Sequence, residues 1–169
     1  NKPAWDSTKY VHWTFKGMHT FLWDKERDFV RVRWDNDNEV LLNTKTVSGN
    51  AYIKGIEVIG QKADEMVQSA WSYFCNDSFW LNAPAKAFDP GTSRSIVTNE
   101  DGTKGLLVSY ESGGVTPGDS YLWLLDESGL PRAYKMWVKI IPVGGVEASW
   151  EKWETVSTGA KIATFHQLK

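Results

Sequence analysis

Residues 10–24 read YVHWTFKGMHTFLWD and alternate bulky apolar side chains with smaller or polar ones. A period of two residues is the pattern of a β-strand with one buried face. We expect one long strand that bends at Gly17, where the missing side chain permits curvature. The alternative is a hairpin at Lys16-Gly17, although Lys-Gly is a weaker turn signal than Asn-Gly or Asp-Gly. On the continuous strand, the core-facing side chains are Val11, Trp13, Phe15, His19, Phe21 and Trp23.

Shorter strands are expected after this one. The charged residues 24–28 predict a turn into FVRVRW, in which Val30, Val32 and Trp34 alternate with two arginines. These strands are expected at 29–34, 39–43 and 51–58.

The sequence predicts one main helix, within KADEMVQSAWSYFCND at residues 62–77. Asp64 can cap its start, and Asn76-Asp77 is expected to end it, which places the helix at 64–76. Two prolines then interrupt regular structure in the following residues 78–91. The apolar stripe of the predicted helix comprises Val67, Ala70, Trp71, Phe74 and Cys75.

The rest of the chain predicts consecutive strands with short turns that contain Gly, Pro or Asp. They are expected at 94–99, 104–111, 120–125, 132–140, 147–156 and 161–168. In 132–140, Tyr134, Met136, Val138 and Ile140 share one face, with a change of parity near Ala133. Many antiparallel strands with one inserted helix predict an α+β fold in which a curved sheet is covered by that helix.

Composition limits the function classes. The 169 residues predict a single domain, and the net charge of −2 provides no positive field for nucleic acid. Ten tryptophans indicate a large apolar interior or a cavity. Cys75 is the only cysteine and can form no internal disulfide. Because the sequence begins at Asn1 rather than at Met, we expect processing or trimming, with any signal peptide out of view.

No pattern of residues predicts catalysis, a metal or a cofactor. His12, His19 and His166 are far apart in the sequence, and the first two have opposite parity on the predicted strand. DNDNE at 35–39 lacks the Gly and the final Glu of a calcium loop and favours a polar hairpin turn. ESGGVTPGD at 111–119 matches no phosphate-binding fingerprint.

Three segments carry a resemblance to a known family: WTFKGMHTFLWDK, NDSFWLNAPAKAFDPGT and GVTPGDSYLWLLDESGLPRAYKMW. With the order of predicted elements, they resemble an uncharacterised bacterial branch of the LolA/LolB-like lipoprotein-carrier superfamily. The resemblance implies a half-open antiparallel barrel with a helical lid over its concave face, enclosing a cavity for acyl chains. It also implies location in the periplasm or at the outer membrane, and allows peripheral or lipid-anchored membrane association. Members usually have an N-terminal helix, whereas only NKPAWDSTK precedes the first predicted strand here, so this chain is expected to lack one.

The leading hypothesis is therefore a non-enzymatic binding or carrier protein for lipid or lipidated protein. A carbohydrate-binding module with exposed Trp, and a small cone-shaped α+β enzyme, are the alternatives. The predicted ligand-binding side chains are Trp13, Phe15, Phe21, Trp23, Val32, Trp34, Met136 and Val138 on the sheet and Val67, Trp71 and Phe74 on the helix.

Overall fold

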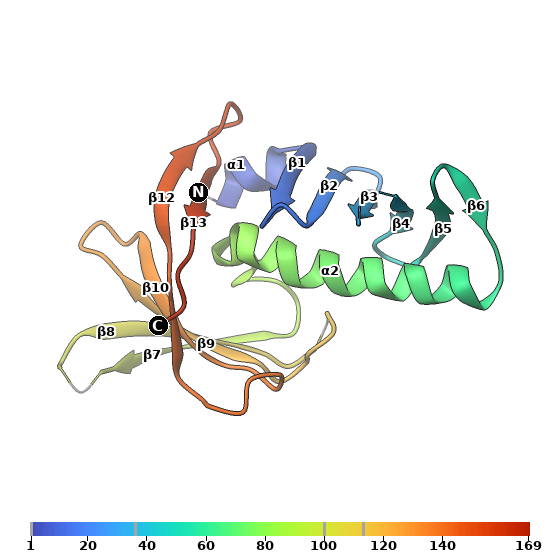
Figure 1. Ribbon diagram of the computed structural model, residues 1–169. Coiled ribbons are helices and arrows are strands. Elements are labelled where there is room, and N and C mark those ends of the chain that lie inside the picture. The colour runs from blue at the N-terminus through green and yellow to red at the C-terminus, as the bar shows by residue number, and fades with distance from the viewer. Residues whose placement is uncertain (1, 36, 100, 113) are drawn as a thin grey trace. The chain divides into compact units, whose positions relative to one another are not determined.

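The computed structural model describes residues 2–35, 37–99, 101–112 and 114–169. The α+β class is confirmed, because antiparallel sheets and one long helix make up most of the chain (Figure 1). The chain divides into two compact units, Asp6–Trp80 and Asn1–Trp5 with Leu81–Lys169.

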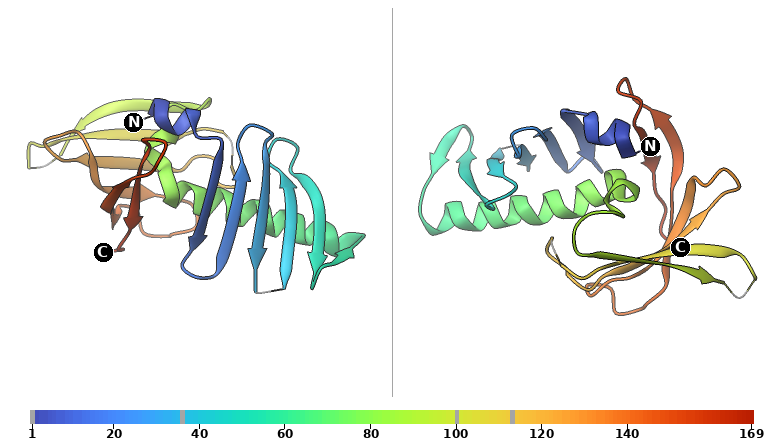
Figure 2. Two further views of the ribbon diagram at one scale, coloured as in Figure 1. Left: turned by 90° about the horizontal axis from the view of Figure 1, so that it is seen from above. Right: turned by 180° about the vertical axis from the view of Figure 1, so that it is seen from behind.

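The Asp6–Trp80 unit is an antiparallel meander of six strands in sequence order. One long helix, α2 (Gln61–Lys86), runs along one side of this sheet (Figure 2). The strands are β1 (Tyr10–Phe15), β2 (His19–Asp24), β3 (Phe29–Trp34), β4 (Asn38–Asn43), β5 (Ser48–Ile53) and β6 (Ile56–Val58).

The other unit contains a five-stranded antiparallel sheet, in the order β11-β10-β9-β8-β7, and a separate hairpin, β12-β13. A six-residue helix, α1 (Lys2–Ser7), lies at the start of the chain, in the stretch expected to hold no helix. The strands are β7 (Thr92–Thr98), β8 (Lys104–Tyr110), β9 (Ser120–Leu125), β10 (Pro131–Trp137), β11 (Val146–Ser149), β12 (Glu151–Thr155) and β13 (Lys161–Phe165).

The prediction of one continuous strand at 10–24 is wrong, because the chain reverses at Lys16-Gly17. Both residues have positive φ, 50° and 70°, and the Met18 N–H donates to the Phe15 carbonyl at 2.9 Å. Positive φ at both central positions is typical of a type I′ turn, whose twist suits a hairpin. Phe15 pairs with His19, so the predicted faces survive although the connection was wrong.

The main helix is twice as long as predicted and does not end at Asn76-Asp77. It begins at Gln61, and the Asp64 N–H donates to the Gly60 carbonyl at 3.2 Å, so Asp64 lies in the first turn rather than at the cap. The helix kinks at Asn82 (φ −156°, ψ 53°), two residues before Pro84, whose ring crowds the preceding turn.

Three other predicted strands are also corrected: two are divided, and one is shorter than expected. The segment 51–58 reverses at Lys54-Gly55, where both residues have positive φ, and 147–156 is divided at Trp150. The segment 132–140 ends at Trp137, which leaves Val138 and Ile140 outside the sheet. The predicted change of parity near Ala133 is confirmed by a β-bulge between Pro131 and Ala133.

Candidate functional site

Nine of the predicted ligand-binding side chains gather in one hydrophobic cluster between α2 and the six-stranded sheet. Phe21 and Val32 are fully buried, and Trp34, Val67 and Phe74 are at most 8% exposed. Around them lie the partly buried side chains of Trp13, Phe15, Trp23 and Trp71. Met136 and Val138 belong to the other unit, where Met136 is buried on β10.

The aromatic rings of this cluster pack against one another. The ring centroids of Trp13 and Phe21 are 4.4 Å apart, and the two ring planes are nearly parallel. The Phe74 and Trp23 rings meet edge-on, with their centroids 5.0 Å apart. Trp71 lies 6.1 Å from Phe74. Such contacts are those of a close-packed core. Contact of these side chains with a ligand stays a prediction.

A buried polar pair joins β2 to α2 at the edge of this core. The Asp77 carboxylate is 1% exposed and lies 2.7 Å from the Nδ1 atom of His19. The Asn76 amide donates to the other carboxylate oxygen at 2.8 Å. Burial raises the pKa of Asp77, and the hydrogen bonds from Asn76 and His19 offset part of that effect. The His19 ring also stacks on the Tyr73 ring of α2, with the ring centroids 4.0 Å apart. His19 thus contacts α2 through both Asp77 and Tyr73, and these contacts fix the position of the helix on the sheet.

A second aromatic cluster forms the interior of the Leu81–Lys169 unit. Trp123 lies 5.0 Å from Tyr134 and 5.1 Å from Trp150, and all three side chains are at most 2% exposed. Burial raises the pKa of the Tyr110, Tyr121 and Tyr134 phenols, which therefore stay protonated at neutral pH. The rings on the β9-β10 hairpin thus serve mainly as the core of this unit.

A cavity of about 380 Å³ opens beside this second core. Its volume falls within the roughly 300–1,000 Å³ of small-molecule sites. Its walls come from the kinked end of α2, strands β8 and β9, the β9-β10 turn with the start of β10, strands β12 and β13, and the first residues of the chain. Its lining residues are Lys2, Asn82, Pro84, Ala85, Ala87, Phe88, Leu106, Trp123, Leu125, Gly129, Leu130, Pro131, Trp153 and Lys161.

Sequence reasoning predicted none of these lining residues as a site. They come from seven separate stretches of the chain, and each stretch alone is typical of an ordinary strand or turn. The one local signal is the kink that Pro84 introduces, which places the almost fully buried Asn82 at the wall.

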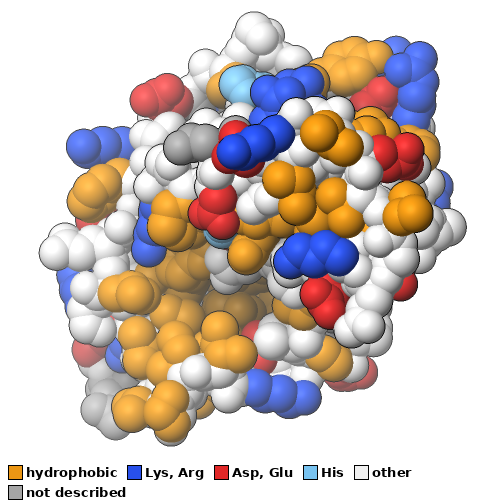
Figure 3. All heavy atoms as spheres, turned by 45° about the vertical axis from the view of Figure 1, so that its right-hand side comes forward, with side chains coloured by type: hydrophobic (Ala, Val, Ile, Leu, Met, Phe, Trp, Pro, Cys, Tyr) orange, Lys and Arg blue, Asp and Glu red, His pale blue; other side chains and the backbone are white. Residues whose placement is uncertain are grey.

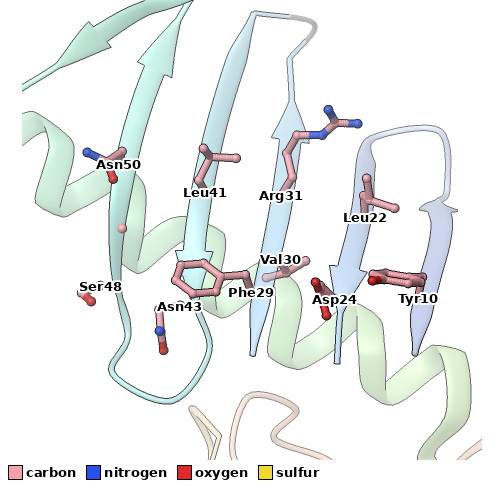
Figure 4. A pocket seen from close by; sticks show the side chains of 11 residues that line it. Tyr10, Leu22, Asp24, Phe29, Val30, Arg31, Leu41, Asn43, Ser48 and Asn50 are labelled. Atoms are coloured by element: carbon pink, nitrogen blue, oxygen red, sulfur yellow. The ribbon is translucent and has the colours of Figure 1, made fainter. Parts of the chain in front are cut away.

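The outer face of the six-stranded sheet carries a shallower depression of about 770 Å³ (Figure 4). Tyr10, Leu22, Phe29 and Leu41 line it and are 56%, 40%, 47% and 39% exposed. Arg31 lies between the two leucines in the cross-strand row. Aspartate and asparagine side chains, Asp24, Asn43 and Asn50, complete its wall.

The polar residues considered for catalysis and metal binding are not brought together. The side chain of His12 is exposed on β1, whereas Nδ1 of His166 lies 3.0 Å from the Ser149 carbonyl in the other unit. Among the described residues, no group of three or more His, Cys, Asp and Glu side chains is arranged to hold a metal ion. Residues 35 and 37 belong to the β3-β4 turn, as predicted for DNDNE, and Asn36 lies outside the described residues. Gly113 of ESGGVTPGD also lies outside them.

Surface charge and hydropathy add two observations. On the face shown in Figure 3, acidic and basic side chains are interspersed among apolar ones. Within the described part of the chain, no helix has both the length and the hydropathy of a membrane span.

Comparison with models of protein families, with curated proteins and with solved structures finds no match to the chain. The resemblance to the LolA/LolB-like superfamily therefore stays a prediction.

Proposed function

We propose that this protein binds an acyl chain, of a lipid or of a lipidated protein, and carries it without chemical turnover. The observation that supports this function is the cavity beside the kinked end of α2. Its walls are mostly aliphatic and aromatic, and Phe88, Leu106 and Trp153 present open apolar surface inside it. An alkyl chain gains roughly 0.8 kcal/mol for each CH₂ that it buries on such a surface.

The distribution of tryptophan supports a carrier over a carbohydrate-binding module with exposed Trp. Of the ten tryptophans, Trp137 alone is exposed, at 43%, and the rest are buried or half-buried. A module that stacks sugars on indole rings needs several of them at the surface. Here the indoles instead form core and cavity wall.

We also propose that the six strands of the Asp6–Trp80 unit form a half-open barrel with α2 as the lid over its concave face. In the Asp6–Trp80 unit, α2 covers one face of the sheet through Met66, Val67, Ala70 and Phe74. The opposite face carries the polar and exposed side chains of the same strands. Location in the periplasm or at the outer membrane, and contact with a lipidated partner, are proposed on the family resemblance.

A cavity-filling substitution tests the site. Leu125 lines the cavity and is 39% exposed, so Leu125→Trp adds bulk there with little disturbance of the core. Leu41→Trp is the matched control, because Leu41 is also 39% exposed but lies on the outer face of the other unit. We expect Leu125→Trp to weaken binding of dodecanol, measured by calorimetry or by fluorescence, and Leu41→Trp to leave it unchanged. Dodecanol binding that Leu125→Trp does not weaken would contradict the proposed site.

One observation favours a second candidate function, carbohydrate binding at the outer depression. The exposed rings of Tyr10 and Phe29 lie near the side chains of Asp24 and Asn43, and aromatic rings next to amides and carboxylates suit a sugar (Figure 4). Titration with soluble oligosaccharides separates the two functions. Oligosaccharide binding that Tyr10→Ala abolishes would favour carbohydrate binding at this depression. If the wild type binds no oligosaccharide, this second candidate function is excluded.

A further inference from the structure

We propose that the acyl ligand is an uncharged ester or amide, and that the Asn82 side chain donates a hydrogen bond to its carbonyl oxygen inside the cavity. This inference rests on the proposed acyl binding and adds the chemistry of the group at which the alkyl chain is attached.

The Asn82 side chain is almost fully buried, and its amide has no hydrogen-bond partner among the described residues. Asn82 is 5% exposed, and no described residue donates to its amide or accepts from it. A buried amide without a hydrogen bond costs free energy, so native structures rarely leave one unpaired. An asparagine at a break in a helix can bond to a nearby backbone group, but Asn82 makes no such bond within the described part of the chain. Support of the kink therefore does not explain this amide.

The amide of Asn82 keeps contact with the space that the residue lines. Neither of its polar atoms is among the described side-chain atoms that are both fully enclosed and without a partner. Both atoms therefore retain a small accessible surface, and Asn82 is one of the lining residues of the cavity. The non-helical backbone at Asn82 (φ −156°, ψ 53°), two residues before Pro84, takes this side chain out of the regular order of α2.

The burial of Asn82 favours an uncharged ligand group at this position. Pro84 follows it on the same wall, and Trp123, another lining residue, is only 2% exposed. The charged residues of the lining, Lys2 and Lys161, are both more exposed than Asn82. A charge costs far more to bury than a neutral group that is hydrogen-bonded. A carbonyl oxygen accepts hydrogen bonds without a charge, and acyl esters and acyl amides both carry one beside the alkyl chain.

The amide nitrogen of Asn82 offers two N–H donors, and its oxygen is an acceptor. An ester carbonyl accepts from one of these donors. An acyl amide accepts in the same way, and its own N–H is a donor that an ester lacks. The two linkages therefore share the contact with the Asn82 nitrogen, and the experiment distinguishes them.

The experiment compares four ligands with one chain length: methyl decanoate, N-methyldecanamide, decanoate and chlorodecane, which has no carbonyl. Each is titrated by calorimetry into the wild type, Asn82→Leu, Asn82→Asp and Asn99→Leu. Asn82→Leu keeps the size of the side chain without its amide, and Asn82→Asp replaces the N–H donors with an oxygen. Asn99→Leu is the matched control, because Asn99 belongs to the same unit, does not line the cavity and donates to the Thr103 hydroxyl at 2.9 Å.

We expect both Asn82 variants to bind the ester and the amide about tenfold more weakly than the wild type, as for the loss of one buried hydrogen bond. Chlorodecane affinity should be the same in all four proteins, and Asn99→Leu should bind every ligand as the wild type does. A loss confined to the ester or to the amide identifies the linkage.

The other outcomes overturn one proposal or the other. Unchanged affinity for the ester and the amide in both Asn82 variants overturns the carbonyl contact and leaves acyl binding intact. Loss of chlorodecane binding in both variants also overturns it, because Asn82 would then shape the site rather than bind the carbonyl. Decanoate affinity that falls in Asn82→Leu as much as that of the ester overturns the uncharged head. Failure of all four ligands to bind the wild type overturns the proposed function itself.

Discussion

Removal of the Asp77 carboxylate should destabilise the protein by about 1.5–3 kcal/mol at neutral pH, the range for hydrogen bonds to charged groups. Asp77→Ala removes two hydrogen bonds, but their loss costs different amounts of free energy. The Asn76 amide belongs to an exposed residue and regains water, whereas the His19 side chain is only 14% exposed and its Nδ1 atom loses its partner. Most of the cost therefore comes from the contact with His19, at 2.7 Å.

The assay is urea denaturation followed by Trp fluorescence, with Asn76→Ala as the control. The control keeps the carboxylate and its bond to His19, so it should cost well under 1 kcal/mol. An Asp77→Ala loss no larger than that of Asn76→Ala would refute the view that the buried pair fixes α2 on the sheet.

The unfolding free energy that Asp77→Ala removes should depend on pH with a definite sign. Burial raises the pKa of Asp77 in the folded protein above its ordinary value of 3.8, so the folded state binds this proton more tightly than the unfolded state. The stability that protonation contributes is fully present below 3.8 and is lost as the pH rises through the raised value. The loss in Asp77→Ala should therefore be larger in acid than at neutral pH. A loss that instead grows with rising pH would contradict the assigned burial effect.

Two further substitutions test the packing of the Asp6–Trp80 unit. Phe74→Ala should cost about 3–5 kcal/mol, and Trp71→Ala less, because Phe74 is 5% exposed whereas Trp71 is only half-buried. Urea denaturation checks both, and a greater loss in Trp71→Ala would show that the ranking is wrong. Gly49→Ala should cost about 1–3 kcal/mol by overpacking, because its new Cβ would lie 2.1 Å from the Leu41 carbonyl oxygen on the neighbouring strand. Thermal unfolding compares it with Ser48→Ala on the same strand, and equal melting temperatures would refute the close approach of β4 and β5.

Much of the sheet could be predicted from the sequence, because alternation reports which side chains share a face. It does not report where the chain reverses. Three residues lie between the paired Phe15 and His19, and a connection of odd length preserves parity just as a continuous strand does. The faces at 10–24 were therefore right while the connection was wrong.

The length of α2 depends on tertiary contacts that the sequence does not display. Aspartate tends to end helices because its carboxylate competes for nearby backbone groups. In this fold the Asp77 carboxylate is bonded to His19, 58 residues away, and to Asn76, so the helix continues past it. The cavity was beyond prediction for a similar reason, since residues as distant as Lys2, Trp123 and Lys161 line it together.

The central claim, that the cavity beside the kinked end of α2 holds an alkyl chain, is tested most directly by a series of neutral alcohols from octanol to hexadecanol. Neutral ligands separate the apolar contribution from any effect of the head group. At roughly 0.8 kcal/mol for each buried CH₂, affinity should rise by about fifteenfold for every two carbons until the cavity is full, and then level off. Calorimetric titration of the wild type and of Leu125→Trp should show this rise, with the plateau reached at a shorter chain in the variant. An affinity that does not change with chain length in the wild type would contradict the account.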